Sequence, residues 1–523
     1  MAREGPLIAS RRPALLALTL VSALSIPSLP QALAAERPEP RQEVPATAND
    51  YRTGLAHNSP ALAADPTEPR FVALASRLDA PGPGCALQVS GDGGRGWIPV
   101  NPVPRLPAGA KACYAPEVAF DRDGTLYYLF VGLRGQGNSP IGVFLTKSED
   151  RGRSFDKPRR LLGAGNYQVR MALDQTLGDA GRLHLVWLQT SEDAPVGGLP
   201  PPPNPIVAAH SDDGGDSFSK PVAVSNHPGR RHVAPAIAVG REHALHVLYY
   251  DLEADRLDYQ GLAGPRWSGH WSLIAASSFD GGEHFEPEAF VNDRVVPPEL
   301  VMLIFTMPPP TLAAGKSGLF AAWHDRRNGD WDVFLSAAGE RARSWGKPKR
   351  LNDDRLRNRR HQYLPRLSLA PEGRLDAVFY DRRDDPKNID NHVYYTSSSD
   401  AGRSFSPNLR LTSTGSDSRY GPRYQVPSAA GKVEFGSRLA LLARDASALA
   451  AWTDTRNSLA PLPQDIFATE VRFAGQGASA GAGEPSGPEW ALLAALGLGA
   501  LFSLWAIRAL GDRRSRRPGA EAA

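Results

Sequence analysis

Three short segments carry an aromatic residue, an aspartate and an arginine at closely similar spacing. They read Trp323-His-Asp325-Arg326-Arg327, Phe379-Tyr-Asp381-Arg382-Arg383 and Trp452-Thr-Asp454-Thr-Arg456. A guanidinium group can donate two parallel hydrogen bonds to a carboxylate. The pattern therefore predicts an anion-binding site built from Arg326, Arg382 and Arg456, with Asp325, Asp381 and Asp454 as candidate catalytic groups. The alternative is structural: each aspartate begins a turn and each arginine pairs with a neighbour.

Arginines also gather in the stretches Asn226–His232, Asn352–Gln362 and Thr412–Tyr424, which hold eight arginines against three acids. Such loops would form a basic rim suited to acidic glycans or other anions. Within them we expect Arg359, Arg360 and Arg423 to contact a ligand, and Tyr424 is a candidate nucleophile. Solvated surface charge is the alternative interpretation.

Three histidines occupy similar places shortly before a proline: His57, His232 and His361. If these side chains converged on one channel, their imidazoles could bind a transition metal. Ordinary histidines at the rim of the fold are the favoured interpretation, so no metal and no cofactor are expected.

The elements that position these residues are indicated by a motif, Ser-x-Asp-x-Gly-x-x-aromatic, that occurs five times. The copies span residues 90–97, 148–155, 211–218, 278–285 and 398–405. Ser and Asp side chains accept hydrogen bonds from nearby backbone amides, and Gly supplies the positive φ of a tight turn. A period near 60 residues predicts a propeller or a solenoid.

The motif resembles the Asp-box, also called the BNR repeat, of the sialidase superfamily. The resemblance covers Tyr51 to Phe473 and implies a β-propeller whose box turns lie on the face opposite the binding site. A sialidase would need three arginines on the substrate carboxylate, an acid–base Asp and a Tyr nucleophile with a Glu partner. Residues Glu68-Pro-Arg70-Phe71 do not match the arginine motif found near the start of that family.

Short apolar runs between Gly, Pro and Asp predict seven blades, with six as the alternative. A sixth, degenerate box is expected between Ser336 and Trp345, with an insertion. The seventh blade lacks a fourth strand, which we expect the segment Glu43–Tyr51 to supply, so that the ring closes without exposed edges.

Segments outside the propeller indicate export and anchoring. Residues 1–35 resemble a signal peptide, because Arg11 and Arg12 precede the apolar run Ala14–Ile26. Residues 36–50 form a linker or closing strand, 51–473 the propeller and 474–489 a flexible linker. Residues 490–510 are expected to be a transmembrane helix, because Trp490–Ile507 carries no charge, and 511–523 a basic cytoplasmic tail.

The net charge of +3 and the pI near 8.8 give no sign of nucleic-acid binding. Cys85 and Cys113 are the only cysteines, and in an exported protein a pair suggests one disulfide, which the sequence leaves open. We therefore expect an exported, membrane-anchored, sialidase-like propeller that binds acidic glycans, with hydrolysis left open. A non-catalytic propeller that binds an envelope protein is the alternative.

Overall fold

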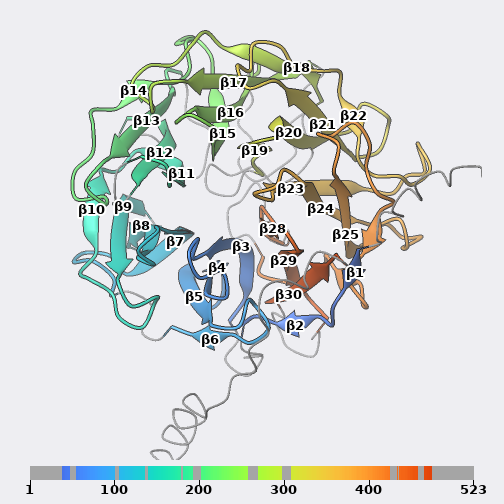
Figure 1. The fold of residues 1–523 in the computed structure, drawn as a ribbon, viewed down its shortest axis with the longest axis horizontal. Helices are drawn as coiled ribbons and strands as arrows, with labels where there is room; N and C mark the ends of the chain where they lie inside the picture. The colour runs from blue at the N-terminus through green and yellow to red at the C-terminus, as the bar shows by residue number, and fades with distance from the viewer. Residues whose placement is uncertain are drawn as a thin grey trace, which may run out of the picture. The chain divides into compact units, whose positions relative to one another are not determined.

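The protein is an all-β propeller of seven sheets arranged around one axis (Figure 1). The structure, a computed structural model, describes residues 38–47, 55–100, 105–135, 139–177, 181–191, 202–256, 269–296, 308–423, 433, 435–456 and 464–473. The innermost strands contact one another in sequence around the ring, and the last contacts the first. The prediction of seven blades is confirmed, and the alternative of six is wrong.

Each blade is a four-stranded antiparallel meander that runs from the axis outward. Blades one to three are β3 (His57–Ala64), β4 (Val72–Leu78), β5 (Gly84–Ser90), β6 (Ile98–Pro99); β7 (Ala112–Phe120), β8 (Leu126–Arg134), β9 (Ser139–Ser148), β10 (Arg159–Leu162); and β11 (Asn166–Asp174), β12 (Arg182–Gln189), β13 (Ile206–Ser211), β14 (Val222–Ala223). Blades four and five are β15 (His232–Val239), β16 (Leu245–Asp251), β17 (Trp271–Ser278), β18 (Ala289–Val295); and β19 (Thr311–Gly315), β20 (Gly318–Asp325), β21 (Asp332–Ala338), β22 (Lys349–Arg350). Blade six is β23 (Gln362–Leu369), β24 (Leu375–Asp381), β25 (Asp390–Ser398), β26 (Leu409–Arg410), with β27 (Ser416–Asp417) also on β25, and blade seven contains β28 (Ala440–Arg444), β29 (Ser447–Asp454) and β30 (Asp465–Arg472).

The second strand of each blade is the most apolar, because a neighbouring blade covers each of its faces. Every residue of β16, β24 and β29 is buried, and Trp187, Trp323 and Trp452, on the second strands of blades three, five and seven, are completely buried. Strands covered on both faces show continuous apolar runs instead of an alternating pattern. The core is therefore a ring of contacts between blades.

The fourth strand of blade seven comes from the other end of the described chain. Strands β1 (Glu39–Pro40) and β2 (Val44–Pro45) both pair with β30, on its outer edge. Glu43, which lies between β1 and β2, accepts hydrogen bonds from the guanidinium of Arg456 and from the backbone amide and hydroxyl of Ser413. The closing strands begin four residues earlier than the expected segment Glu43–Tyr51 and overlap its first residues.

The five box turns have the hydrogen bonds that their residue types predict. In each, the third strand ends on the box serine, whose hydroxyl donates to the box aspartate at 2.7–2.8 Å and accepts from the box glycine amide at 2.7–2.9 Å. The box glycines have φ between 74° and 97°. A Cβ on Gly215 would lie 2.6 Å from Leu145 of the preceding blade, so only glycine fits this seam between two blades.

The degenerate box of blade five has no insertion, and the expected alignment on Ser336 is wrong. Strand β21 ends on Ala338, which occupies the serine position, and Trp345 occupies the aromatic position seven residues later. Between them Glu340 stands for the aspartate, and Ala342 adopts φ 50° where the other boxes have glycine. A cavity of about 140 Å³ lies at this seam, lined by residues of blades four and five that include His246, Phe279 and Arg341.

Cys85 and Cys113 form a disulfide that joins β5 of blade one to β7 of blade two. No helix among the described residues is long and apolar enough to cross a membrane. The expected signal peptide, residues 1–35, and the apolar run Trp490–Ile507 lie outside the described residues.

We predict that Ser211→Ala lowers the free energy of unfolding by about 1–3 kcal/mol, because it leaves the buried Gly215 amide without an acceptor. Chemical unfolding followed by tryptophan fluorescence measures the change. Ser217→Ala, which removes an exposed hydroxyl from the same box, is the matched control and should cost less. Equal losses in the two variants would contradict the role assigned to the buried serine.

Candidate functional site

The innermost strands of five blades share an unusual backbone conformation close to the axis. Ser59, Ala115, Gln168, Ala234 and Leu364 occupy equivalent positions with φ between 50° and 56°. At each of them the pairing with the second strand shifts, as in a β-bulge. Gly436, with φ 93°, stands at the corresponding place before β28. Positive φ in non-glycine residues is uncommon and tends to occur at functional sites.

The residue two positions after the positive φ is charged in four of these six blades. These residues are Glu117, Arg170, Arg366 and Arg438, and the remaining two are Ala61 and Ala236. The four come from blades two, three, six and seven, yet their charges act on one another. We call these four residues the axial cluster; it carries three positive charges and one negative charge.

Glu117 is the centre of the axial cluster. Its Oε1 accepts hydrogen bonds from Arg170 Nη1 at 2.6 Å and from Arg438 Nη1. Burial opposes ionisation of Glu117, but Arg438 and Arg170 more than offset this effect and hold the pKa of its carboxyl below the usual value. The two arginines also donate to backbone carbonyls of other blades, at Pro235, Ser59 and Pro116, so they join the innermost strands.

Arg366 differs from the other members of the axial cluster. Its Nε is buried and has no hydrogen-bond partner among the described residues. Burial and the charge of Arg438 lower the pKa of Arg366 to about 10, so the guanidinium remains protonated at neutral pH. A buried guanidinium without a carboxylate partner is costly, and an anion that reached it would remove that cost.

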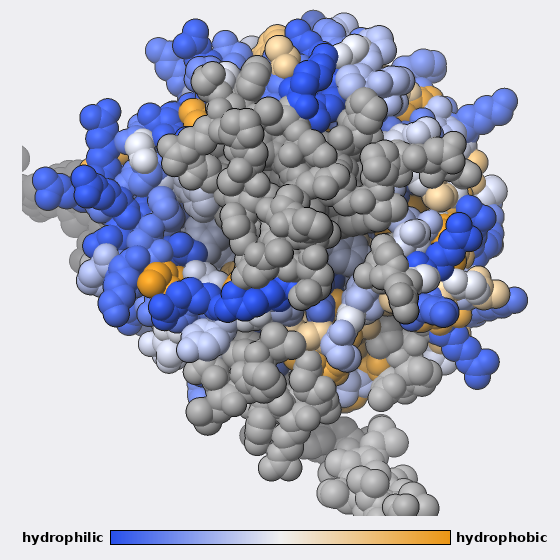
Figure 2. All heavy atoms as spheres, turned by 180° about the vertical axis from the view of Figure 1, so that it is seen from behind, coloured by the Kyte–Doolittle hydropathy of each residue, from blue (hydrophilic) through white to orange (hydrophobic). Residues whose placement is uncertain are grey.

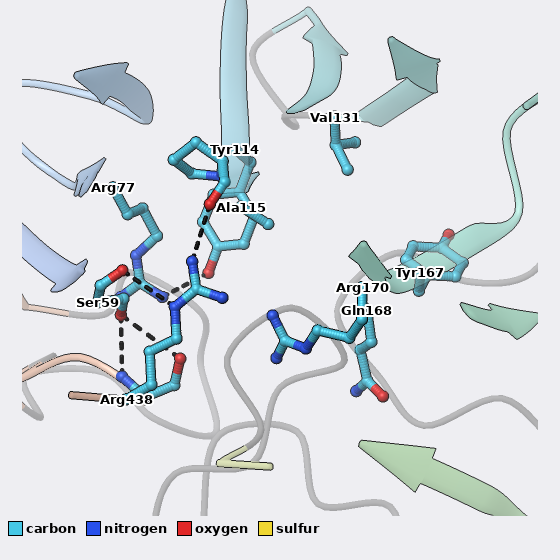
Figure 3. Close-up of a pocket in the computed structure, with 11 residues that line it drawn as sticks. Ser59, Arg77, Tyr114, Ala115, Val131, Tyr167, Gln168, Arg170 and Arg438 are labelled. Carbon is cyan, nitrogen blue, oxygen red and sulfur yellow. Dashed lines mark hydrogen bonds between the residues drawn. The ribbon is translucent and has the colours of Figure 1, made fainter. Parts of the chain in front are cut away.

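A small pocket opens beside the axial cluster and is lined by Arg77, Arg170, Arg438 and Tyr114 (Figure 3). In Figure 3 the side chains of Arg170 and Arg438 extend toward the same space from opposite sides. Its volume of about 30 Å³ would hold about two water molecules or one carboxylate group. Arg77 is held in place by Asp79, at 2.6 Å, and donates to the Tyr114 hydroxyl at 2.9 Å.

The aspartates expected from the repeated loop motif begin turns in the way the structural alternative describes. Asp325, Asp381 and Asp454 are buried at the ends of β20, β24 and β29. Each accepts bonds from the backbone amide and the guanidinium of the residue two positions later, which is Arg327, Arg383 or Arg456. Burial raises the pKa of Asp381, against the opposing effect of Arg383.

The expected ligand-binding arginines therefore do not occupy equivalent positions. Arg456 corresponds to Arg327 and Arg383, and it is bonded to Asp454 and to Glu43 of the closing segment. Arg382 donates from all three guanidinium nitrogens, to Asn391, Asn388 and Ser418 among others, within its own blade. Arg326 is partly exposed in its turn. Their role in ligand binding stays a prediction.

The remaining loop residues lie on connections from a fourth to a first strand. Arg359 and Arg423 are exposed and Arg360 is half-buried, while Tyr424 lies outside the described residues. Hydrophilic side chains surround the rim of the face seen in Figure 2. A contribution of Arg359, Arg360 and Arg423 to a basic rim remains a prediction.

The three candidate histidines have separate surroundings. His57 lies 3.1 Å from the Ser76 hydroxyl, His232 packs edge-on to Tyr249, and His361 lies against Trp331 with ring centroids 4.7 Å apart. Within the part of the chain that the structure describes, no three His, Cys, Asp or Glu residues form a group that could hold a metal ion.

The axial cluster was not predicted, although the sequence contains a signal for it. Glu117 and Arg366 each directly follow the proline that marks the start of an innermost strand, where Ala61 and Ala236 stand in two other blades. A charged residue at a position that is alanine in two other blades departs from the repeat pattern, and such a departure marks a candidate functional residue. The bulge that directs it toward the axis has no comparable sequence signal.

The seven blades and the five Ser-Asp-Gly turns define this chain as a seven-bladed β-propeller with repeated box turns. No protein-family model and no curated protein matches the sequence. Similar solved structures include a protein of unknown function from Dyadobacter fermentans (13% identity, TM-score 0.44, 83% of this chain and 99% of that one). Others are the NanB sialidase of Streptococcus pneumoniae (10%, 0.40, 69% and 69%) and an alpha-L-arabinofuranosidase of Fusarium graminearum (12%, 0.42, 84% and 99%). These similarities are too distant to carry a functional assignment.

We predict opposite effects on stability for two substitutions in the axial cluster. Glu117→Gln should lower the free energy of unfolding by about 3–5 kcal/mol, because the largely buried guanidinium groups of Arg170 and Arg438 lose the carboxylate that pairs with both of them. Arg366→Met should leave stability unchanged or raise it, because it removes a charged group whose buried Nε has no hydrogen-bond partner among the described residues. Both changes can be measured by chemical unfolding, and a large loss in Arg366→Met would show that Arg366 has a structural partner.

Proposed function

We propose that this propeller is exported and membrane-anchored, and that it binds acidic glycans by placing a sugar carboxylate against the axial cluster. The observation that carries the proposal is Arg366, whose buried Nε has no hydrogen-bond partner among the described residues, beside a cluster that holds more arginines than acids. A carboxylate would accept charge-assisted, forked hydrogen bonds there. The exposed Arg359 and Arg423 would attract the ligand electrostatically.

The proposed activity is binding and does not include hydrolysis. The two carboxylates bonded to arginines at the pocket are Glu117 and Asp79, and both are ion-paired. The Tyr114 hydroxyl accepts a hydrogen bond from Arg77 Nη1. A glycosidase needs one carboxyl group as acid and another group as nucleophile or base. These contacts favour recognition of charge over catalysis.

The disulfide between blades one and two supports export, because such bonds persist in oxidising compartments. The apolar run Ala14–Ile26 after Arg11 and Arg12, and the uncharged run Trp490–Ile507 before five arginines, support a signal and an anchor.

The glycan proposal can be tested with the full chain in neutral detergent, titrated with α2,3-sialyllactose and with lactose. Wild type should bind the sialylated probe, more weakly as salt rises, and Arg366→Met should weaken it about tenfold or more. Arg366→Lys should not restore it, because lysine lacks the fork. Arg341→Met, on the box face, is the matched control and should bind like wild type.

Two outcomes would contradict this assignment. Loss of binding in Arg359→Met with Arg360→Met, but not in Arg366→Met, would move the site to the loop rim. Equal binding of both probes, insensitive to salt, would favour the alternative of a propeller that binds an envelope protein.

The anchor is tested by truncation. We predict that a chain ending at Ala480 no longer sediments with membranes, because it lacks the uncharged run Trp490–Ile507. Sedimentation of the truncated chain with membranes would show that the anchor lies elsewhere. The same assay on the full chain after a high-salt wash separates insertion from electrostatic adsorption.

A further inference from the structure

A second group of arginines lies on the box face, at the seam where the ring closes. Arg41 lies between the two closing strands, Arg95 belongs to the box of blade one, Arg444 ends β28 and Arg472 ends β30. We call these four residues the seam cluster. First strands and third strands both end on the box face, so the cluster belongs to that face and is separate from the axial cluster.

One carboxylate serves the seam cluster. Glu470 Oε2 lies 3.0 Å from Arg472 Nε and 3.3 Å from Arg41 Nε. Burial lowers the pKa of Arg41, and Arg472 and Arg95 lower it further against the effect of Glu470. Three further acids lie on or beside these elements. Glu39 of β1 pairs in register with Arg472, Asp445 Oδ1 accepts the Glu372 amide, and Asp92 Oδ1 accepts the hydroxyl of Ser90 and the amides of Arg95 and Gly96. Within the described residues, the ion pairs of the seam cluster run from Arg41 and Arg472 to Glu470.

Arg444 is a half-buried member of the seam cluster. Its Nη1 donates to the Gly93 carbonyl at 3.3 Å, while its Nε and Nη2 are buried without a hydrogen-bond partner among the described residues. Burial lowers the pKa of Arg444, and Arg95 lowers it further. Guanidinium N–H groups that lie close together and lack protein acceptors favour the binding of an anion with several oxygen atoms.

The chain leaves the propeller beside this cluster. Phe473 follows Arg472, packs its ring 3.8 Å from the guanidinium carbon of Arg374 and donates its amide to the Ala446 carbonyl. The exit point is therefore fixed on the box face. In the sequence, only sixteen residues separate Phe473 from the uncharged run that begins at Trp490.

We propose that the seam cluster binds the phosphate group of an anionic lipid headgroup, so that the box face lies on the membrane and the axial cluster's opening faces away from it. This inference rests on the proposed anchoring. A lipid phosphate carries several acceptor oxygens and is concentrated at a membrane surface, and basic residues beside an anchor are attracted to it. The sixteen-residue linker keeps the seam cluster within reach of that surface.

The test uses the full chain in neutral detergent and calorimetric titration with dihexanoyl phosphatidylglycerol, dihexanoyl phosphatidylcholine and inorganic phosphate. Wild type should prefer phosphatidylglycerol, and Arg95→Gln should weaken that binding about fivefold. Arg95 is exposed, so this variant keeps the fold. Arg444→Gln should weaken it at least as much.

Arg153→Gln is the matched control, because Arg153 occupies in the box of blade two the position that Arg95 occupies in blade one. It should bind phosphatidylglycerol like wild type. Arg366→Met should also leave this binding unchanged, while Arg95→Gln should leave sialyllactose binding unchanged. The experiments therefore test glycan binding at the axial cluster and lipid binding at the seam cluster independently of each other.

Three results would overturn the proposal. The first is equal binding of the two lipids. The second is an equal effect of Arg95→Gln and Arg153→Gln. The third is saturable, Arg95-dependent binding of inorganic phosphate without a preference for phosphatidylglycerol, which would indicate a site for a free anion.

Discussion

The structure depends on one constraint: every blade is a sheet that must be covered on both faces by its neighbours. A strand such as β24, buried along its whole length, is stable only when blades stand on both sides of it. The ring must therefore close, and the two segments at its ends must meet. The pairing of β1 and β2 with β30 meets this requirement and removes the exposed edges of an open sheet.

Closure also explains why charge collects at the axis. Seven innermost strands converge there, so a residue that a bulge directs inward meets residues from other blades. Glu117, Arg170 and Arg438 join five blades through side-chain and backbone hydrogen bonds, because their innermost strands lie close together. Arg366 occupies the same position, but within the described part of the chain its buried Nε has no hydrogen-bond partner.

The sequence predicted the parts of this structure that repeat. The box residues form local hydrogen bonds in every copy, so the turns and the blades they join could be inferred from single segments. The blade-five box was misaligned because Ala338, Glu340 and Ala342 replace all three polar or glycine positions, leaving only Trp345 as a marker. The loop aspartates were recognised as a repeated feature, yet only the structure shows that Asp454 is bonded to Arg456 two residues later.

The axial cluster could not be found in the same way, because it depends on contacts between blades. Arg366 and Glu117 lie 249 positions apart in the chain, and nothing local to either one encodes the other. The seam cluster has the same origin, since Arg41 and Arg472 meet only when the ring closes. In this propeller the repeated motifs therefore specify the blades and their turns. The charged clusters come from positions at which single blades depart from the repeated pattern. A charge placed where two other blades have alanine is costly to bury unless a partner offsets it, and for Glu117, Arg170 and Arg438 that partner comes from another blade.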